Sequence, residues 1–159
     1  MPTKSSSTDP SPLSRDRWFL GTLMRFHVTA SDSRGAFSVV EQLLPEGFSP
    51  PRHVHANEAG LIYVLEGAVE VEVAGARRLL NATECAFLPK GVEHTFRGAV
   101  RSRILEVTAP GGVDAFYEEN AVPAEREELP PPAAPDIPRL VATAKAHEID
   151  IVGPPMEPD

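Results

Sequence analysis

The feature that most constrains this chain is a run of short apolar segments that end at glycine or proline. The stretch LIYVLEGAVEVEVAG at residues 61–75 shows it best, because valines at 69, 71 and 73 alternate with glutamates at 70 and 72. A period of two places the valines on one face of a β-strand and the glutamates on the other. Gly67 and the segment AGAR interrupt the pattern and predict turns. A strand that buries one face needs a second layer of sheet against it.

Similar segments fill residues 17–110. They include RWFLGTLMRFHVTA, AFSVVEQLLPEG, CAFLPKG, EHTFRG and SRILEVTAP, with Gly and Pro between them. Many short strands at regular spacing are typical of an all-β barrel or sandwich rather than of alternating strands and helices. We therefore predict one β-barrel domain over residues 17–110.

The two flanking segments differ from this domain in composition. Residues 1–16 hold almost nothing to bury and predict a disordered tail. In residues 111–159, GGVDAFYEENA predicts a short helix and ELPPPAAPDIP an extended connector. DIPRLVATAKAHE predicts a helix capped by Asp136, and EIDIVG a short strand. Because Ile137, Leu140, Val141 and Ala144 form one apolar stripe, we expect this extension to pack on the barrel or on a partner subunit.

Composition and charge exclude several classes of protein. The chain has 159 residues, a net charge of −8 and no basic block, which argues against nucleic acid or an anionic membrane as a partner. Cys85 is the only cysteine, so the chain forms no internal disulfide and no cysteine-based zinc cluster. No window approaches the ~20 apolar residues of a membrane span, and the N-terminal stretch is unlike a signal peptide. We expect a soluble, cytoplasmic protein.

The histidines carry the chemistry that can be anticipated. The chain has five, and His53 and His55 share one face of a strand because they are two residues apart. Two imidazoles side by side suit one metal ion, and His94 follows a Pro-Lys-Gly turn from which it can face the pair. His27 and His147 receive no role in the site. The pattern predicts a divalent metal site.

These residues resemble the cupin superfamily. GFSPPRHVHANEAGLIYVLEG is similar to the first cupin motif and TECAFLPKGVEHTFRG to the second, and the C-terminal part resembles small quercetin-dioxygenase-like bacterial cupins. The resemblance implies a double-stranded β-helix, the cupin jelly-roll barrel, which is usually dimeric and holds a metal in its lumen. The matching positions are Gly47, His53, His55, residue 60, Gly67, Pro89, Gly91 and His94.

The sequence departs from the motifs at residue 60, where the usual ligand Glu is Gly60. Thr83 and Gly98 are further departures, but both concern turns. Three outcomes stay open: a three-histidine site, a site completed by Glu58, or a cavity without metal. Three neutral imidazoles leave a divalent ion at its full charge, which favours an anionic chelating substrate and leaves positions open for it. Glu58 is favoured as a solvated loop residue.

The resemblance and the residues together predict a function. We expect a mononuclear iron dioxygenase-type enzyme and homodimer that holds Fe(II) and acts on a small enolisable or aromatic molecule; Zn, Mn, Ni or Co are the other candidate ions. The alternatives are a non-redox cyclase or isomerase and a non-catalytic small-molecule-binding cupin. Glu41 or Glu106 could act as a general base if either faces inward. The expected pocket residues are Phe26, Phe37, Val39, Ile62, Val64, Phe87 and Phe96.

Overall fold

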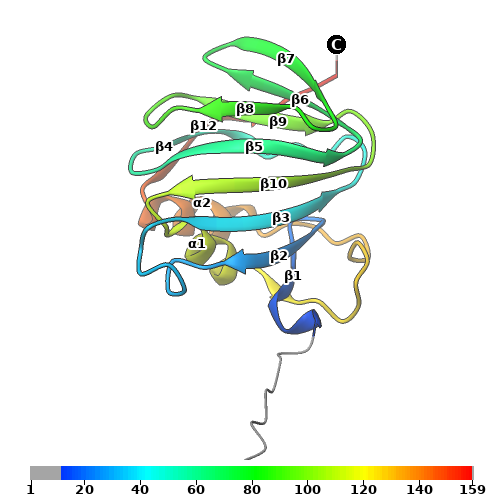
Figure 1. Cartoon of the computed structure of the whole chain (residues 1–159), viewed down its shortest axis with the longest axis vertical. Coiled ribbons are helices and arrows are strands. Elements are labelled where there is room, and N and C mark those ends of the chain that lie inside the picture. Colours follow the sequence, from blue (N-terminus) through cyan, green and yellow to red (C-terminus); the bar gives the residue numbers. More distant parts are fainter. Residues whose placement is uncertain (1–11, 159) are drawn as a thin grey trace, which may run out of the picture.

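Two antiparallel sheets form the body of the molecule (Figure 1). The computed structural model describes residues 12–158. The larger sheet has the order β11 (Val122–Pro123), β1 (Asp16–Phe19), β2 (Thr22–Val28), β3 (Ser38–Leu44), β10 (Ser102–Ala109), β5 (Ala59–Glu66) and β8 (Cys85–Leu88). The smaller has the order β12 (Ile149–Pro155), β4 (Pro51–His55), β9 (His94–Gly98), β6 (Ala68–Val73) and β7 (Ala76–Asn81). This architecture confirms the predicted all-β jelly-roll barrel.

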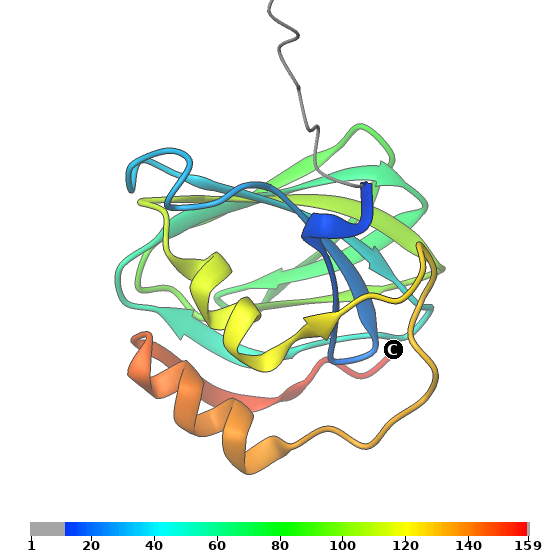
Figure 2. The same cartoon turned by 90° about the horizontal axis from the view of Figure 1, so that it is seen from below.

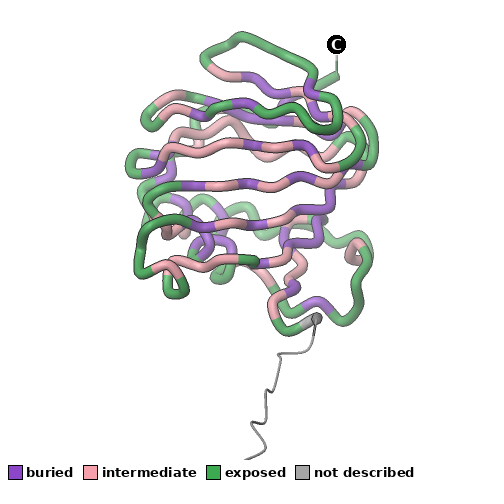
Figure 3. The backbone as a smooth tube through the Cα atoms, viewed as in Figure 1, coloured by how far each residue is buried: buried purple, intermediate pink, exposed green. Residues whose placement is uncertain are grey.

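Alternation along the strands decides which side chains enter the barrel. In β6, Val69 and Val71 are buried, as their period of two predicts. Glu72 is buried as well, because Arg52 and Arg77 bind its carboxylate at 2.7 and 2.8 Å. Figure 3 shows the same alternation of buried and partly exposed residues along β3 and β10.

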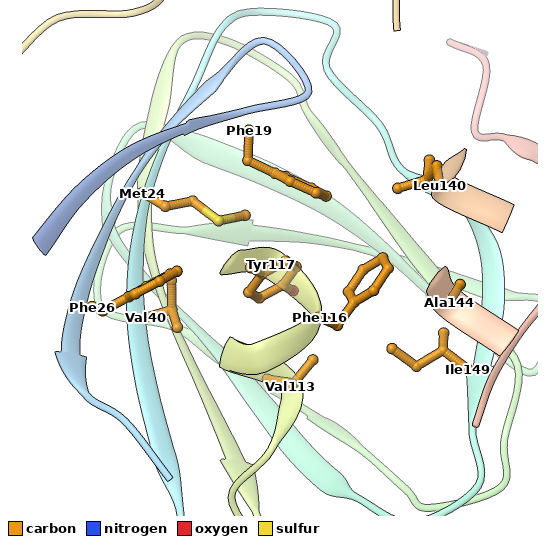
Figure 4. Packing of buried hydrophobic residues seen from close by; sticks show 10 residues of the cluster. All are labelled: Phe19, Met24, Phe26, Val40, Val113, Phe116, Tyr117, Leu140, Ala144 and Ile149. Carbon is orange, nitrogen blue, oxygen red and sulfur yellow. The ribbon is translucent and has the colours of Figure 1, made fainter. Parts of the chain in front are cut away.

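The interior divides into two main apolar clusters. One fills the part of the barrel lined by β5, β6 and β8 and contains Leu44, Ile62, Val64, Val69, Val71, Leu80, Ala86, Leu88, Phe96 and Ile104. The other joins the first strands to the helices and contains Phe19, Met24, Phe26, Val40, Val113, Phe116, Tyr117, Leu140, Ala144 and Ile149 (Figure 4).

Two helices follow the barrel strands. α1 (Val113–Asn120) contacts β1, β3 and α2, and α2 (Ile137–Ala146) packs on β12. Figure 2 shows α2 and β12 side by side, with α1 between them and the first strands. Asp136 caps α2 as predicted, by accepting a 3.1 Å hydrogen bond from the Arg139 amide. The apolar stripe of α2 is only partly covered, since Leu140 and Ala144 are buried and Ile137 and Val141 are exposed.

The barrel begins earlier than the sequence suggested. Residues 12–15 form a 3-10 turn, and Asp16 already belongs to β1, although both lie in the predicted tail. The reason is an ion pair: the buried Asp16 carboxylate binds Arg25 through two hydrogen bonds of 2.7 and 2.9 Å. Residues 1–11 of the predicted tail lie outside the described residues. Within residues 12–158, neither helix has the length and apolarity that a bilayer span requires.

Candidate metal centre

The structure brings His53, His55 and His94 together. His53 and His55 project from β4, and His94 begins β9 directly opposite His53 in the antiparallel pairing. The ring centroid of His53 lies 5.0 Å from that of His55 and 4.5 Å from that of His94. One ring nitrogen from each residue lies within 4.8 Å of the other two. The spacing of two residues and the register of one strand pair are enough to build this cluster.

The outer ring nitrogens of the three histidines have distinct surroundings. His53 Nδ1 lies 2.7 Å from the Pro51 carbonyl oxygen, and His94 Nδ1 lies 3.1 Å from the Val92 carbonyl oxygen. A carbonyl accepts only, so each Nδ1 carries the proton and each Nε2 keeps its lone pair. Hydrogen bonds of this kind are what orient histidine ligands in metal sites.

Burial keeps two of these imidazoles neutral. It lowers the pKa of His53 to about 3, with the neighbouring His94 and His55 adding to the effect. Burial also lowers the pKa of His94 to about 4, and His55 again contributes. Near neutral pH both side chains therefore offer a lone pair rather than a positive charge, which is the state that binds a cation.

The donor set fits a divalent ion. Two nitrogens that each lie about 2.1 Å from an ion are separated by about 3.0–3.4 Å in octahedral or tetrahedral geometry. The ligand nitrogens of the three histidines already lie within 4.8 Å of one another, so they gather around one position. Imidazole accepts Fe, Zn, Ni and Cu alike, so the three side chains fit a transition metal without selecting one.

Glu58 is buried rather than solvated, which corrects the favoured interpretation of this residue. Its Oε2 lies 3.4 Å from His55 Nδ1, and neither atom has a hydrogen-bond partner among the described residues. The carboxylate therefore approaches the outer nitrogen of His55, on the side of the ring away from Nε2. It is not among the residues whose ligand atoms converge in the histidine cluster. Its position suits a residue that orients His55 better than one that binds an ion directly.

A small, mostly apolar cavity opens beside the histidines. Its volume is about 50 Å³ when measured as the space open to the centre of a water molecule. His53 and His55 lie in its wall together with Phe19, Leu20, Met24, Gln42, Phe48, Pro50, Pro51, Phe96, Glu106, Phe116, Tyr117, Leu140, Ala144, Ile149 and Ile151.

Polar side chains on the cavity wall come from β3, β10 and α1. The Tyr117 hydroxyl donates a 2.6 Å hydrogen bond to Glu106 Oε1. Burial raises the pKa of Glu106, while Tyr117, His55 and Gln42 act in the opposite direction. Burial and the adjacent Glu106 raise the pKa of Tyr117 well above its usual value, so its hydroxyl remains a donor.

Three of the expected pocket residues do not line this cavity because their strands face the other way. Phe37 is 41% exposed just before β3, and Phe87 is 66% exposed on β8. Ala86 and Leu88 are the inward residues of β8, and Val40 rather than Val39 is the buried residue of β3. The expectation that Phe37, Val39 and Phe87 line the pocket is therefore wrong. The alternation of β3 and β8 is shifted by one residue, so that their neighbours point inward instead.

The remaining expected residues do face inward. Phe96 lines the cavity. Ile62 and Val64 are fully buried, but they belong to the packed cluster of the barrel, and Phe26 belongs to the cluster under the helices. Phe26, Ile62 and Val64 thus fill the interior without bordering the cavity. The inward parity was right, and the distinction between packed core and open cavity was missed.

The two candidate bases separate clearly. Glu41 faces outward and binds Arg103 and His27 at 2.5 and 2.9 Å. Glu106 faces inward with its neighbours Ile104 and Thr108 in the same parity. Gln42 and Tyr117 were not anticipated. Gln42 alternates with the apolar Val40 and Leu44, which is the pattern that could have identified it.

Comparisons with known proteins agree with this architecture. A family model described as "Cupin domain" matches residues 39–108. Quercetin 2,3-dioxygenase from Bacillus subtilis (strain 168) is 32% identical over 108 residues, which are 67% of this chain and 32% of that protein. The chain thus spans about a third of the length of this curated relative.

Solved structures share this fold over more than half of the chain. An RmlC-like cupin from Shewanella frigidimarina NCIMB 400 superimposes with a TM-score of 0.57 at 18% identity, over 69% of this chain and 96% of that one. KdgF from Halomonas sp. gives a TM-score of 0.55 at 21% identity, over 60% and 84% of the two chains. At these identities the likeness concerns the fold alone. With both histidine motifs, the barrel and these matches in agreement, the chain belongs to the cupin superfamily.

Proposed function

We propose that this protein is a metal-dependent cupin enzyme of the dioxygenase type that acts on a small enolisable or aromatic molecule. The observation that carries the proposal is the convergence of His53, His55 and His94, two of which, His53 and His55, line a mostly apolar cavity. The three side chains would hold Fe(II), which would supply the electrons and open coordination positions that O₂ chemistry requires.

The cavity limits the size of the substrate. The name of the Bacillus subtilis relative points to quercetin, a molecule of three rings. The cavity, at about 50 Å³, is small beside the ~300–1,000 Å³ of common ligand pockets, which favours a smaller molecule. We infer a small substrate, whose apolar part lies against Phe96 and Phe116 and whose oxygens face the histidines.

A second candidate is a non-redox isomerase or cyclase. Glu106 favours it, because a buried carboxylate beside the histidines can move a proton without any oxidant. In that case the site would hold Zn²⁺ or a similar ion that polarises a carbonyl group.

Metal analysis separates these possibilities. Purified protein is loaded anaerobically with Fe(II), and in parallel with Zn, Mn, Ni or Co, and the bound metal is measured by mass spectrometry. We expect stoichiometric metal in the wild type and in His27→Ala, whose imidazole pairs with Glu41 outside the barrel. His94→Ala should lose the metal, and retention there would refute the site.

The same samples identify the reaction type. Iron-loaded protein is screened for O₂ consumption with small diketones, enediols and hydroxy-ketones. Substrate-dependent O₂ uptake supports the dioxygenase. Conversion of a substrate by the zinc form without O₂ uptake supports the isomerase or cyclase instead.

A further inference from the structure

We propose that Glu106 is a catalytic residue that takes the hydroxyl proton of a small chelating substrate, that Gln42 binds the neighbouring oxygen of that substrate, and that Tyr117 positions Glu106. This proposal rests on the proposed function, since the deprotonated oxygen is the one that turns toward the histidines. It also names the substrate class, a molecule that carries a hydroxyl and a carbonyl oxygen on adjacent atoms.

The three side chains meet because two strands and one helix converge. In the register of β3 and β10, Ile104 lies opposite Gln42, so Gln42 and Glu106 are diagonal neighbours on the inner face. Tyr117 reaches the same point from α1 (Figure 4 shows its side chain among the apolar cluster). Gln42 is 1% exposed, Glu106 7% and Tyr117 9%, and all three line the cavity.

Glu106 lacks the arginine partner that the buried Asp16 and Glu72 have, a lack that it shares with the buried Asp114 and Glu58. Asp16 binds Arg25, Glu72 binds Arg52 and Arg77, and Asp114 accepts a 2.6 Å hydrogen bond from the Ser38 hydroxyl. Within residues 12–158, Glu106 forms no ion pair, and Tyr117 provides its hydrogen bond to Oε1. A buried carboxylate without a counter-charge costs stability. Glu106 differs from Asp114 and Glu58 because it alone of the three lines the cavity, where a ligand can reach it.

Gln42 is the second indication of a ligand. Its amide group lies beside Glu106 and lowers the pKa of that carboxyl, but Nε2 forms no well-aligned hydrogen bond with any of the described residues. A buried donor left unpaired costs about 1–3 kcal/mol. A substrate oxygen in the cavity would accept this hydrogen bond and remove that cost.

The proton transfer balances without any further reagent. Oε1 of Glu106 accepts from Tyr117, which leaves Oε2 for the substrate. The substrate O–H bond breaks, its proton moves to Oε2, and its electron pair stays on the oxygen. The substrate leaves this step as an anion and Glu106 as a neutral acid. The Nε2–H of Gln42 donates to the adjacent carbonyl oxygen, which fixes the orientation of both substrate oxygens.

A proton count tests this directly. Acetohydroxamic acid is a small neutral probe whose N-hydroxyl loses a proton when its two oxygens bind a cation. It is titrated calorimetrically into Zn-loaded protein at about pH 8, because burial raises the pKa of Glu106 above the usual carboxyl range and the test needs its ionised form. Repeating the titration in buffers of different ionisation enthalpy gives the number of protons released to solution per bound probe, and the zinc form consumes no O₂.

In the wild type we expect almost no proton release, because Glu106 keeps the proton. In Glu106→Gln each bound probe should release a proton to the buffer. Gln42→Leu should keep the wild-type count but bind the probe about tenfold more weakly. In Tyr117→Phe the hydrogen bond that favours the carboxylate is gone, so the pH above which Glu106 takes the proton should move upward.

The control is Glu41→Gln, which makes the same change on β3 but on the outer face. Its proton count should match the wild type. A full proton released by the wild type overturns the proposal even if Glu106→Gln fails to fold, and so does failure of the zinc form to bind the probe. If zinc itself does not bind, the proposed function has failed instead, and the metal analysis shows this separately.

Discussion

Gly60 lies directly opposite Thr108 in the pairing of β5 with β10, and the two backbones leave no room for a side chain at residue 60. A Cβ atom there would lie 2.9 Å from the Val107 carbonyl oxygen and 3.2 Å from Thr108 Cγ2. The absence of the usual glutamate is therefore built into the spacing of two strands.

This spacing predicts the effect of adding a side chain. Gly60→Ala should destabilise the fold by about 1–3 kcal/mol, the usual cost of overpacking, measured by urea unfolding. Gly60→Glu should be at least as unstable and should not raise metal affinity. Gly153→Ala is the matched control, since its Cβ would contact the Arg52 side chain at an ordinary 3.4 Å. Tighter metal binding by Gly60→Glu would contradict the argument.

The metal-free protein should lose stability as the pH falls through the histidine range. The pKa is lowered from 6.5 to about 3 in His53 and to about 4 in His94. Between about 4 and 6.5 the unfolded chain therefore binds more protons than the native protein. Each histidine contributes a slope of up to about 1.4 kcal/mol per pH unit, and stability rises with pH.

Glu106 acts in the opposite direction over part of this range. Its pKa is raised from 4.5, so above that value the native protein holds a proton that the unfolded chain has lost. The contribution of Glu106 cancels that of one histidine. The free energy of unfolding should therefore still rise with pH, by about 1.4 kcal/mol per pH unit. Urea unfolding of chelator-treated protein from pH 4.5 to 6.5 measures it. A flat profile would show that the two imidazoles are not held neutral.

Filling the cavity from α2 should block the ligand and spare the metal. Ala144 is buried and lines the cavity, so the larger side chain of Ala144→Leu would occupy that space. We expect the zinc content to be unchanged and acetohydroxamate binding to fall at least tenfold, at about 1–3 kcal/mol of fold stability. Ala142→Leu places the same change on an exposed position of α2 and should leave binding intact. Undiminished binding to Ala144→Leu would place the ligand elsewhere.

The ion pair at the start of the barrel should be essential for stability. Asp16 is 0% exposed, so Arg25→Leu leaves a carboxylate buried without its partner. We expect a loss of about 3 kcal/mol, at the low end for such pairs because Arg25 is partly exposed. Thermal unfolding measures it. Arg15→Leu breaks the exposed pair with Asp32 and should leave the melting temperature nearly unchanged.

Local patterns determined what could be predicted. The period of two in residues 68–73 gave β6, and the spacing of His53 and His55 gave two ligands on one face. The helix capped by Asp136 was also found from adjacent residues. In each case the decisive neighbours are close in the chain.

The remaining features depend on contacts between distant segments. CAFL is apolar on both faces, so nothing local shows that Phe87 points outward. Glu58 looks like a loop residue until the fold buries it next to His55. The contact of Tyr117 with Glu106 exists because α1 turns back over β10, and no periodicity encodes that turn.

The pairing of β12 with β4 has a consequence for the order of assembly. β4 meets β9 at the single pair His53–His94, whereas Ile149 and Ile151 of β12 pair with His55 and His53. Most of the backbone support for the two-histidine strand thus comes from β12, which a ribosome makes after the other strands of residues 12–158. A growing chain would expose its histidines long before they are held in place. Metal acquisition should accordingly be a late, post-synthetic event in the life of each molecule.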